Sequence, residues 1–184
     1  MTRAGFVGAC AILLAALAAC RPAENAPAPR TGTHLPVVAP VPQSAASVVL
    51  VKRGAVRPDT RAAVAFVDVA ATRADRERGL GGRTALDPDH GMLFVYASTA
   101  LHRFWMKDCA IGLDIAFVRE DGTIARIATL PPAAGLPDEE IPDADSGEPV
   151  RYVVEMEPHW FARHGVAAGD RIDVAAAAAG VRPE

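Results

Sequence analysis

The chain has few aromatic residues and almost no cysteine from which to build a core or a reactive centre. Aromatic side chains make up 5% of its 184 residues, and cysteine occurs only at Cys10, Cys20 and Cys109. The core must therefore come mainly from Val, Ile and Leu, helped by the few aromatic residues near residues 102–118. Because Cys10 and Cys20 belong to an N-terminal segment of export type, Cys109 has no intramolecular partner. We expect its thiol to be a small buried hydrophobic group and not a nucleophile.

The sequence also lacks the patterns of several enzyme and binding classes. Its histidines from His90 onward are scattered over different predicted elements, so neither a metal site nor a cofactor is predicted. It contains no phosphate-cradling glycine loop, no serine-nucleophile elbow and no HExxH pattern. The net charge is −3 and becomes −4 without residues 1–19, whose only charged side chain is Arg3. This balance does not favour a nucleic-acid partner.

The N-terminus is typical of a bacterial lipoprotein signal. A basic start is followed by an apolar run from Ala4 to Leu17 and by small residues directly before Cys20. The run is too short for a comfortable membrane-spanning helix, and small residues before a cysteine fit a cleavage site whose cysteine is acylated. We therefore expect residues 1–19 to be removed and Cys20 to carry the lipid that attaches the protein to the membrane. Arg21, which is not an aspartate, favours the periplasmic face of the outer membrane.

One domain follows a tether. Residues 20–47 are rich in Ala and Pro, which predicts a disordered segment that reaches away from the bilayer. Residues 48–176 are enough for one ordinary domain and too few for two, and residues 177–184 form a short tail.

The pattern of residues 48–176 predicts a mainly β domain of the α+β type. Short apolar runs recur between turn residues, and Asp121 with Gly122 marks a hairpin of type I′ between residues 113–119 and 123–130. Thr72 predicts the start of a short helix over 73–78, and Pro158 predicts another helix that ends near His164. Residues 131–149 carry many Pro, Asp, Glu and Gly residues, which predicts an exposed acidic loop. We expect a small antiparallel, closed or nearly closed barrel of about six to eight strands with two short helices.

Five motifs together resemble one known family. The chain reads GLGGR from Gly79, GMLFVY from Gly91, FWMKDC from Phe104, LDIAF from Leu113 and YVVEM from Tyr152. In this order and spacing, over roughly residues 48–174, the set resembles the DUF192 family. The resemblance implies a small, mainly β domain, found alone or behind a secretion signal, without an assigned activity. At Gly81 the family usually has a methionine.

The candidate site consists of charged residues in apolar surroundings and one neighbouring aromatic residue. They are Arg83, Trp105, Lys107, Asp114 and Glu155. A carboxylate inside an apolar strand needs a cation, hydrogen-bond donors or a proton, because desolvating it alone is costly. We therefore predict that Asp114 or Glu155 pairs with Arg83 or Lys107 in one network.

Three functions fit these residues. The leading hypothesis is a ligand-binding or accessory module of the cell envelope whose ligand is a small molecule, a glycan or a peptide, with Trp105 and Lys107 as a stacking surface. The first alternative is a hydrolase-like enzyme that uses Asp114 or Glu155. The second is a structural partner of another envelope protein, in which the charges only fix the strand register. For Trp105 alone, packing in the core is the favoured role.

Overall fold

The computed structural model describes the backbone of residues 46–51 and 61–184 and the side chains from residue 63 onward. The predicted signal, Cys20 and most of the predicted tether lie outside these residues. The first described strand begins at Ala46, two residues before the predicted start of the domain. None of the helices in the described ranges is long and apolar enough to cross a membrane.

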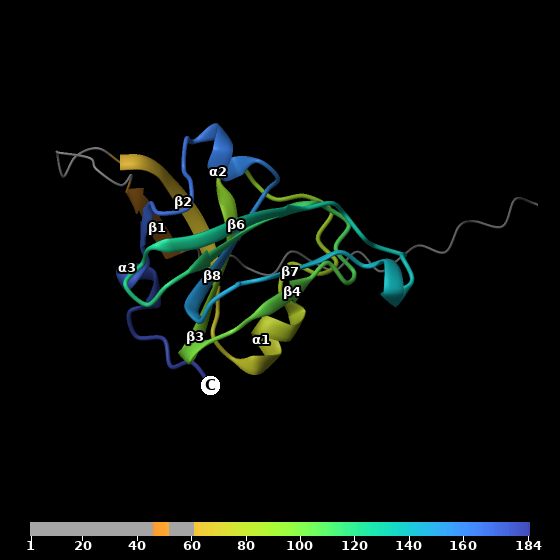
Figure 1. Cartoon of the computed structure of the whole chain (residues 1–184), viewed down its shortest axis with the longest axis horizontal. Coiled ribbons are helices and arrows are strands. Elements are labelled where there is room, and N and C mark those ends of the chain that lie inside the picture. Colours follow the sequence, from red (N-terminus) through yellow and green to blue (C-terminus); the bar gives the residue numbers. More distant parts are fainter. Residues whose placement is uncertain (1–45, 52–60) are drawn as a thin grey trace, which may run out of the picture. The chain divides into compact units, whose positions relative to one another are not determined.

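The described residues contain nine strands, which form two sheets (Figure 1). The strands are β1 (Ala46–Val51), β2 (Arg61–Ala70), β3 (His90–Ala100), β4 (Arg103–Trp105), β5 (Leu113–Val118), β6 (Ile124–Leu130), β7 (Asp143–Asp145), β8 (Val150–Met156) and β9 (Arg171–Asp173). Seven of them form one sheet in the order β6-β5-β8-β3-β2-β1-β9, and β4 pairs with β7 in a small second sheet. The helices are α1 (Arg73–Arg78), α2 (Trp160–Arg163) and α3 (Ala175–Ala178), with a short 3₁₀ turn, η1 (Asp138–Glu140).

This arrangement confirms a mainly β domain but not a barrel. Strands β2 and β3 pair in parallel, because α1 lies between them and carries the chain back, whereas the other strand pairs are antiparallel. The outer strands of the large sheet meet at one end alone, through an isolated bridge between Thr123 and Arg171 and the backbone bonds beside it, and they do not pair along their length, so the sheet is not closed into a barrel. The described residues also hold three short α-helices where two were predicted.

Local signals account for the helix and hairpin positions. The hydroxyl of Thr72 accepts a bond from the backbone N–H of Asp75, as an N-cap should. In the hairpin between β5 and β6 the N–H of Gly122 bonds to the carbonyl of Arg119, and Gly122 has φ 84° while Asp121 has a negative φ. The turn is therefore a type I turn followed by a left-handed glycine, and not the predicted type I′ turn.

The two faces of the large sheet bury different clusters. One face packs against Trp160 and Phe161 of α2, which are almost completely buried. Helix α2 begins two residues after Pro158, because His159 adopts a left-handed conformation with φ 62°. The other face is covered by the small β4–β7 sheet and by the segment that follows α1. In Figure 1, α1 and α2 accordingly lie on opposite sides of β8.

The predicted acidic loop over residues 131–149 is partly a folded element. It contains η1 and β7, and three of its acids, Asp138, Asp143 and Asp145, form ion pairs with basic residues from other segments. Ala144 of β7 is buried against the large sheet. This segment therefore forms part of the cover over the second face.

Candidate functional site

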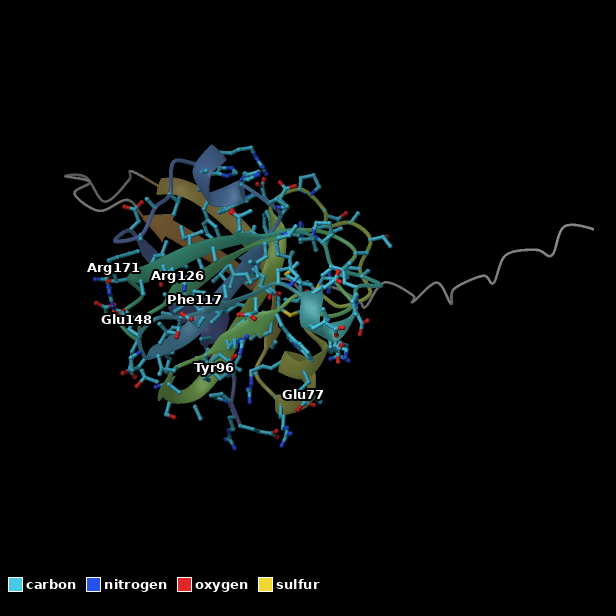
Figure 2. The ribbon with its side chains drawn as sticks, turned by 45° about the vertical axis from the view of Figure 1, so that its right-hand side comes forward. Glu77, Tyr96, Phe117, Arg126, Glu148 and Arg171 are labelled. Atoms are coloured by element: carbon cyan, nitrogen blue, oxygen red, sulfur yellow. The ribbon has the colours of Figure 1, made fainter. Side chains whose placement is uncertain are left out.

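A pocket of about 270 Å³ opens between α1, the start of β4 and the large sheet. Its floor is β8, and its walls come from α1, β3 and the segment from β4 to Cys109. Figure 2 labels Glu77 of α1 and Tyr96 of β3, two lining residues, on this side of the domain. The pocket thus lies on the face that the small sheet only partly covers.

Glu155 lies at the base of this pocket. It belongs to β8, between Met92 of β3 and Ile115 of β5, so the strand register buries it and leaves its side chain 6% exposed. Within the described part of the chain its Oε2 atom has no hydrogen-bond partner. Burial raises the pKa of Glu155 to about 8, because the charged form loses its water. At neutral pH the carboxyl is therefore mainly protonated and offers an O–H to the pocket.

Two other titratable side chains of the lining experience the same environment. Burial, reinforced by the carboxyl of Glu155, raises the pKa of Cys109 to about 11. Burial also raises the pKa of Tyr96 to about 12, with Arg76 opposing and Glu155 reinforcing the rise. Both side chains are neutral at physiological pH. Cys109 is 6% exposed, which agrees with a buried, unreactive thiol.

Five cations surround the pocket, and four of them already have acidic partners. Arg73 pairs with Glu77, Arg78 with Asp75, Arg103 with Asp143, and Lys107 with Asp138 at 3.0 Å. The fifth cation, Arg76, donates to the main-chain oxygens of Ala71, Val95 and Glu184 and lies 5.0 Å from the centre of the Tyr96 ring. No acidic side chain of the described residues forms an ion pair with Arg76.

Trp105 and Lys107 stand together at the mouth. Trp105 is 57% exposed, and the Lys107 ammonium lies 5.1 Å from the centre of its ring. Packing in the core is therefore the wrong interpretation of Trp105, because β4 is short and directs this ring away from the large sheet. The surface resembles the cation and aromatic pair that the sequence predicted.

Asp114 lies on the opposite face of the sheet from Glu155. Strand β5 aligns Asp114 with Met156 and Ile115 with Glu155, so the two acids point to different sides. The carboxylate of Asp114 accepts bonds from the Thr129 hydroxyl at 2.6 Å and from the Phe161 N–H at 3.4 Å. Asp114 therefore joins β5 to β6 and α2 and does not line the pocket.

Arg83 is also separate. Its guanidinium bonds to Asp68 of β2 at 2.7 Å, and both side chains are largely buried. The predicted network of Arg83, Lys107, Asp114 and Glu155 is wrong, because none of these four side chains pairs with another of the four. The structure brings only Trp105, Lys107 and Glu155 together in one pocket.

Several residues that line the pocket were not predicted from the sequence. Arg76 and Tyr96 were not singled out, although three arginines in the short helix and a tyrosine at the polar end of an apolar strand were visible in the sequence. Phe94 and Phe104, which meet edge to face with centres 4.9 Å apart, supply an apolar wall. Nowhere in the described residues do three or more His, Cys, Asp or Glu side chains gather as a metal site would require.

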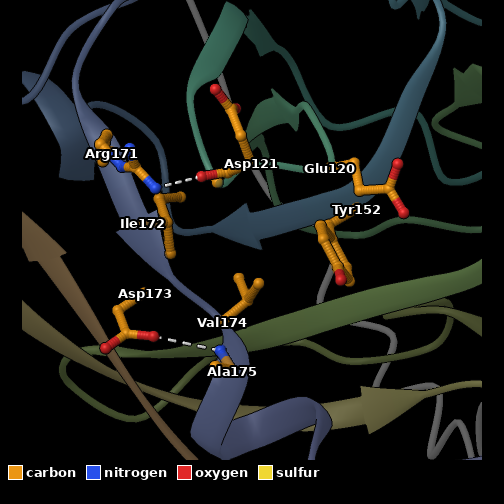
Figure 3. A pocket seen from close by; sticks show the side chains of 9 residues that line it. Glu120, Asp121, Tyr152, Arg171, Ile172, Asp173, Val174 and Ala175 are labelled. Atoms are coloured by element: carbon orange, nitrogen blue, oxygen red, sulfur yellow. Dashed lines mark hydrogen bonds between the residues drawn. The ribbon is translucent and has the colours of Figure 1, made fainter.

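A larger pocket of about 460 Å³ lies elsewhere, between the β5–β6 turn, Tyr152 and the segment from β9 to α3 (Figure 3). Two of its charged side chains bond to the pocket's own walls. Arg171 donates to the carbonyl of Asp121, and Asp173 accepts from the N–H of Ala175 at 3.2 Å. No buried polar atom of its lining lacks a partner. We therefore regard the smaller Glu155 pocket as the candidate site.

The chain belongs to the DUF192 family, described as "Uncharacterized ACR", whose model matches residues 55–174. A crystal structure from Sinorhizobium meliloti 1021, of a protein provisionally named a transcription regulator, is 34% identical and covers 72% of this chain and 95% of its own, with a TM-score of 0.62. A protein of unknown function from Novosphingobium aromaticivorans DSM 12444 is 25% identical and covers 70% and 84%, with a TM-score of 0.56. No curated protein matches the chain.

The family match confirms the resemblance seen in the five motifs. It brings no assigned activity, so the function has to be argued from the chemistry of the site.

Proposed function

We propose that this protein is a lipid-anchored protein of the bacterial envelope whose domain binds a small ligand in the Glu155 pocket. The observation that carries the proposal is the Oε2 atom of Glu155, which is buried and unpartnered within the described residues, in a pocket of about 270 Å³. A buried polar group without a partner costs about 1 to 3 kcal/mol, which a ligand that accepts its hydrogen bond recovers. The expected anchor at Cys20 would hold this pocket outside the cytoplasm.

The size and lining of the pocket support a small ligand. Its volume is slightly below the range of about 300 to 1,000 Å³ typical of sites for drug-sized molecules. Apolar rings line one side and polar groups converge from the other, as in sites that fix the orientation of a bound molecule. A small metabolite, or the end group of a longer glycan or peptide, would fill it.

A hydrolase that uses both buried acids is not supported. Asp114 and Glu155 point to opposite faces of the sheet, so one substrate cannot meet both carboxyl groups. The thiol of Cys109 is held neutral by the rise of its pKa to about 11, mainly through burial, which removes it as a nucleophile at neutral pH.

The test is a thermal-shift screen of the purified full-length protein against sugars, peptidoglycan fragments, peptides, nucleotides and small organic acids. A ligand at 100 times its dissociation constant stabilises a protein by about 2.7 kcal/mol. Glu155→Leu, which removes the carboxyl, should abolish the shift. Asp114→Asn, which alters a buried acid outside the pocket, should keep it. The proposal fails if no compound stabilises the protein, or if the shift survives in the Glu155 variant.

Binding also has an internal optical reporter. The chain has two tryptophans, one exposed at the pocket mouth and one fully buried on the other face of the sheet. Ligand binding should change the emission of Trp105 and leave that of Trp160 unchanged. Trp105→Phe should therefore remove the optical signal, whereas a ligand that still changes the emission of this variant binds elsewhere.

A further inference from the structure

Resting on the proposed ligand-binding function, we infer that the ligand of this pocket is an organic monocarboxylate. Its carboxylate group lies between the Glu155 carboxyl and the Arg76 guanidinium, and its apolar body lies against the pocket's aromatic wall.

The carboxyl of Glu155 defines one half of the recognition. Glu155 lines the pocket, its Oε2 atom is buried and unpartnered among the described residues, and the protonated carboxyl has a single hydrogen bond to donate. A bond from a neutral acid to an ionised oxygen is short and roughly twice as strong as one between neutral groups. A ligand carboxylate therefore satisfies this donor better than a hydroxyl or an amide does.

Arg76 defines the charge of the ligand. Four of the five cations around the pocket have acidic partners, while Arg76 forms no ion pair with an acidic side chain of the described part. Three of its five N–H groups bond to main-chain oxygens, so two remain for a ligand. The single positive charge of the Arg76 guanidinium balances one negative charge, whereas a phosphate monoester brings about 1.5 to 2. The balance favours a carboxylate over a phosphate.

The remaining surfaces specify an apolar body. Phe94 and Phe104 form an apolar wall, and Trp105 stands exposed at the mouth beside Lys107. Neither Tyr96 nor Cys109 carries a charge at neutral pH, so the carboxylate meets no competing anion deep in the pocket. The nearest acid of the wall, Glu77 on α1, is paired with Arg73 and is exposed.

The test measures binding of phenylacetate and hexanoate to the full-length protein by calorimetry and by Trp105 fluorescence. Phenylacetamide serves as the uncharged control ligand, and phenyl phosphate serves as the dianionic control ligand. Phenylacetate is expected to bind at least tenfold more tightly than either. Its affinity should be constant between about pH 6 and 7, where the ligand is ionised and Glu155 is protonated, and should fall towards tenfold per pH unit above pH 8, because an ionised Glu155 repels the ligand.

Two variants separate recognition from folding. Glu155→Gln keeps a neutral donor, so binding of phenylacetate should persist and its loss above pH 8 should disappear. Arg76→Lys keeps the charge but loses the planar fork, and should weaken phenylacetate at least tenfold without changing the affinity for phenylacetamide. Asp114→Asn should leave both affinities unchanged.

The outcomes distinguish this inference from the function on which it rests. If a neutral sugar or phenyl phosphate binds in a Glu155-dependent manner and the carboxylates do not, the monocarboxylate assignment is overturned and the pocket is still a binding site. If the amide binds as tightly as phenylacetate, the charge argument on Arg76 is overturned. If no class of compound binds, the proposed function and the inference are both rejected.

Discussion

Replacing Glu155 by glutamine is expected to change how the stability of this domain depends on pH. The carboxyl is buried, its Oε2 atom is unpartnered within the described residues, and burial raises its pKa from 4.5 to about 8. A carboxyl with a raised pKa in the folded state contributes stability that is complete below pH 4.5. This contribution is lost as the pH rises towards 8, because the unfolded chain releases the proton first. A glutamine side chain at this position has no proton that titrates in this pH range.

The size of the effect follows from the same values. The difference of about 3.5 pKa units, at about 1.36 kcal/mol per unit, corresponds to on the order of 4 to 5 kcal/mol. That is a large share of the 5 to 15 kcal/mol by which domains are usually stable. The wild type and Glu155→Gln should therefore be similarly stable at pH 5, and the variant should be more stable by several kcal/mol at pH 9.

The assay is urea denaturation between pH 4 and 9, followed by the emission of the buried Trp160. The quantity compared is the difference in unfolding free energy between variant and wild type, since other titrating groups cancel in it. Glu139→Gln, which changes an exposed acid of the described region, serves as the matched control and should follow the wild-type curve. Parallel curves for wild type and Glu155→Gln would refute the argument and would mean that water or a cation reaches this carboxyl.

Four further changes have defined outcomes. Gly91→Ala should lower the unfolding free energy by about 3 kcal/mol or more in urea denaturation, because its Cβ would lie 2.0 Å from the Glu155 carbonyl oxygen on the adjacent strand. An unchanged midpoint would mean that β3 and β8 separate easily. Cys109 should react slowly with Ellman's reagent in the native protein and rapidly in urea, since burial raises its pKa to about 11; rapid native labelling would contradict this. A double-mutant cycle on Arg83 and Asp68 should give a coupling free energy of about 1 kcal/mol or more. Additive effects would show that the ion pair contributes nothing to the stability of the domain. Mass spectrometry should find an acylated mature N-terminus at Cys20, and a mature chain that begins elsewhere would contradict the anchor.

Local chemistry explains which parts of the fold were predictable. The cap at Thr72 and the Asp-Gly turn are each specified by neighbouring residues, and each is found close to its predicted position. The predicted barrel closure and the purely antiparallel order depend instead on contacts between distant segments. The parallel pairing of β2 with β3 places residues 24 apart beside each other, as in the pair Phe66 and His90. Composition and periodicity do not specify such a pair.

The same limit applies to the candidate site. Alternation along β5 and β8 shows which residues of one strand share a face, but not how the faces of two strands correspond. That depends on the register, and a shift by one residue exchanges the faces. Asp114 and Glu155 were therefore grouped by their shared character as acids in apolar strands. The register that aligns Ile115 with Glu155 separates them.

These two acids show which feature distinguishes a structural from a functional buried carboxyl in this domain. Asp114 and Glu155 are almost equally inaccessible, at 1% and 6% exposed. Asp114 receives bonds from Thr129 and from the backbone of α2, and by accepting them it holds that helix against the sheet. Glu155 has an oxygen that no described group satisfies, and its residue lines a pocket. Burial alone would assign them the same role. Because an unsatisfied buried group is costly to keep, its position at the base of an open pocket is the stronger argument that a ligand supplies the missing partner.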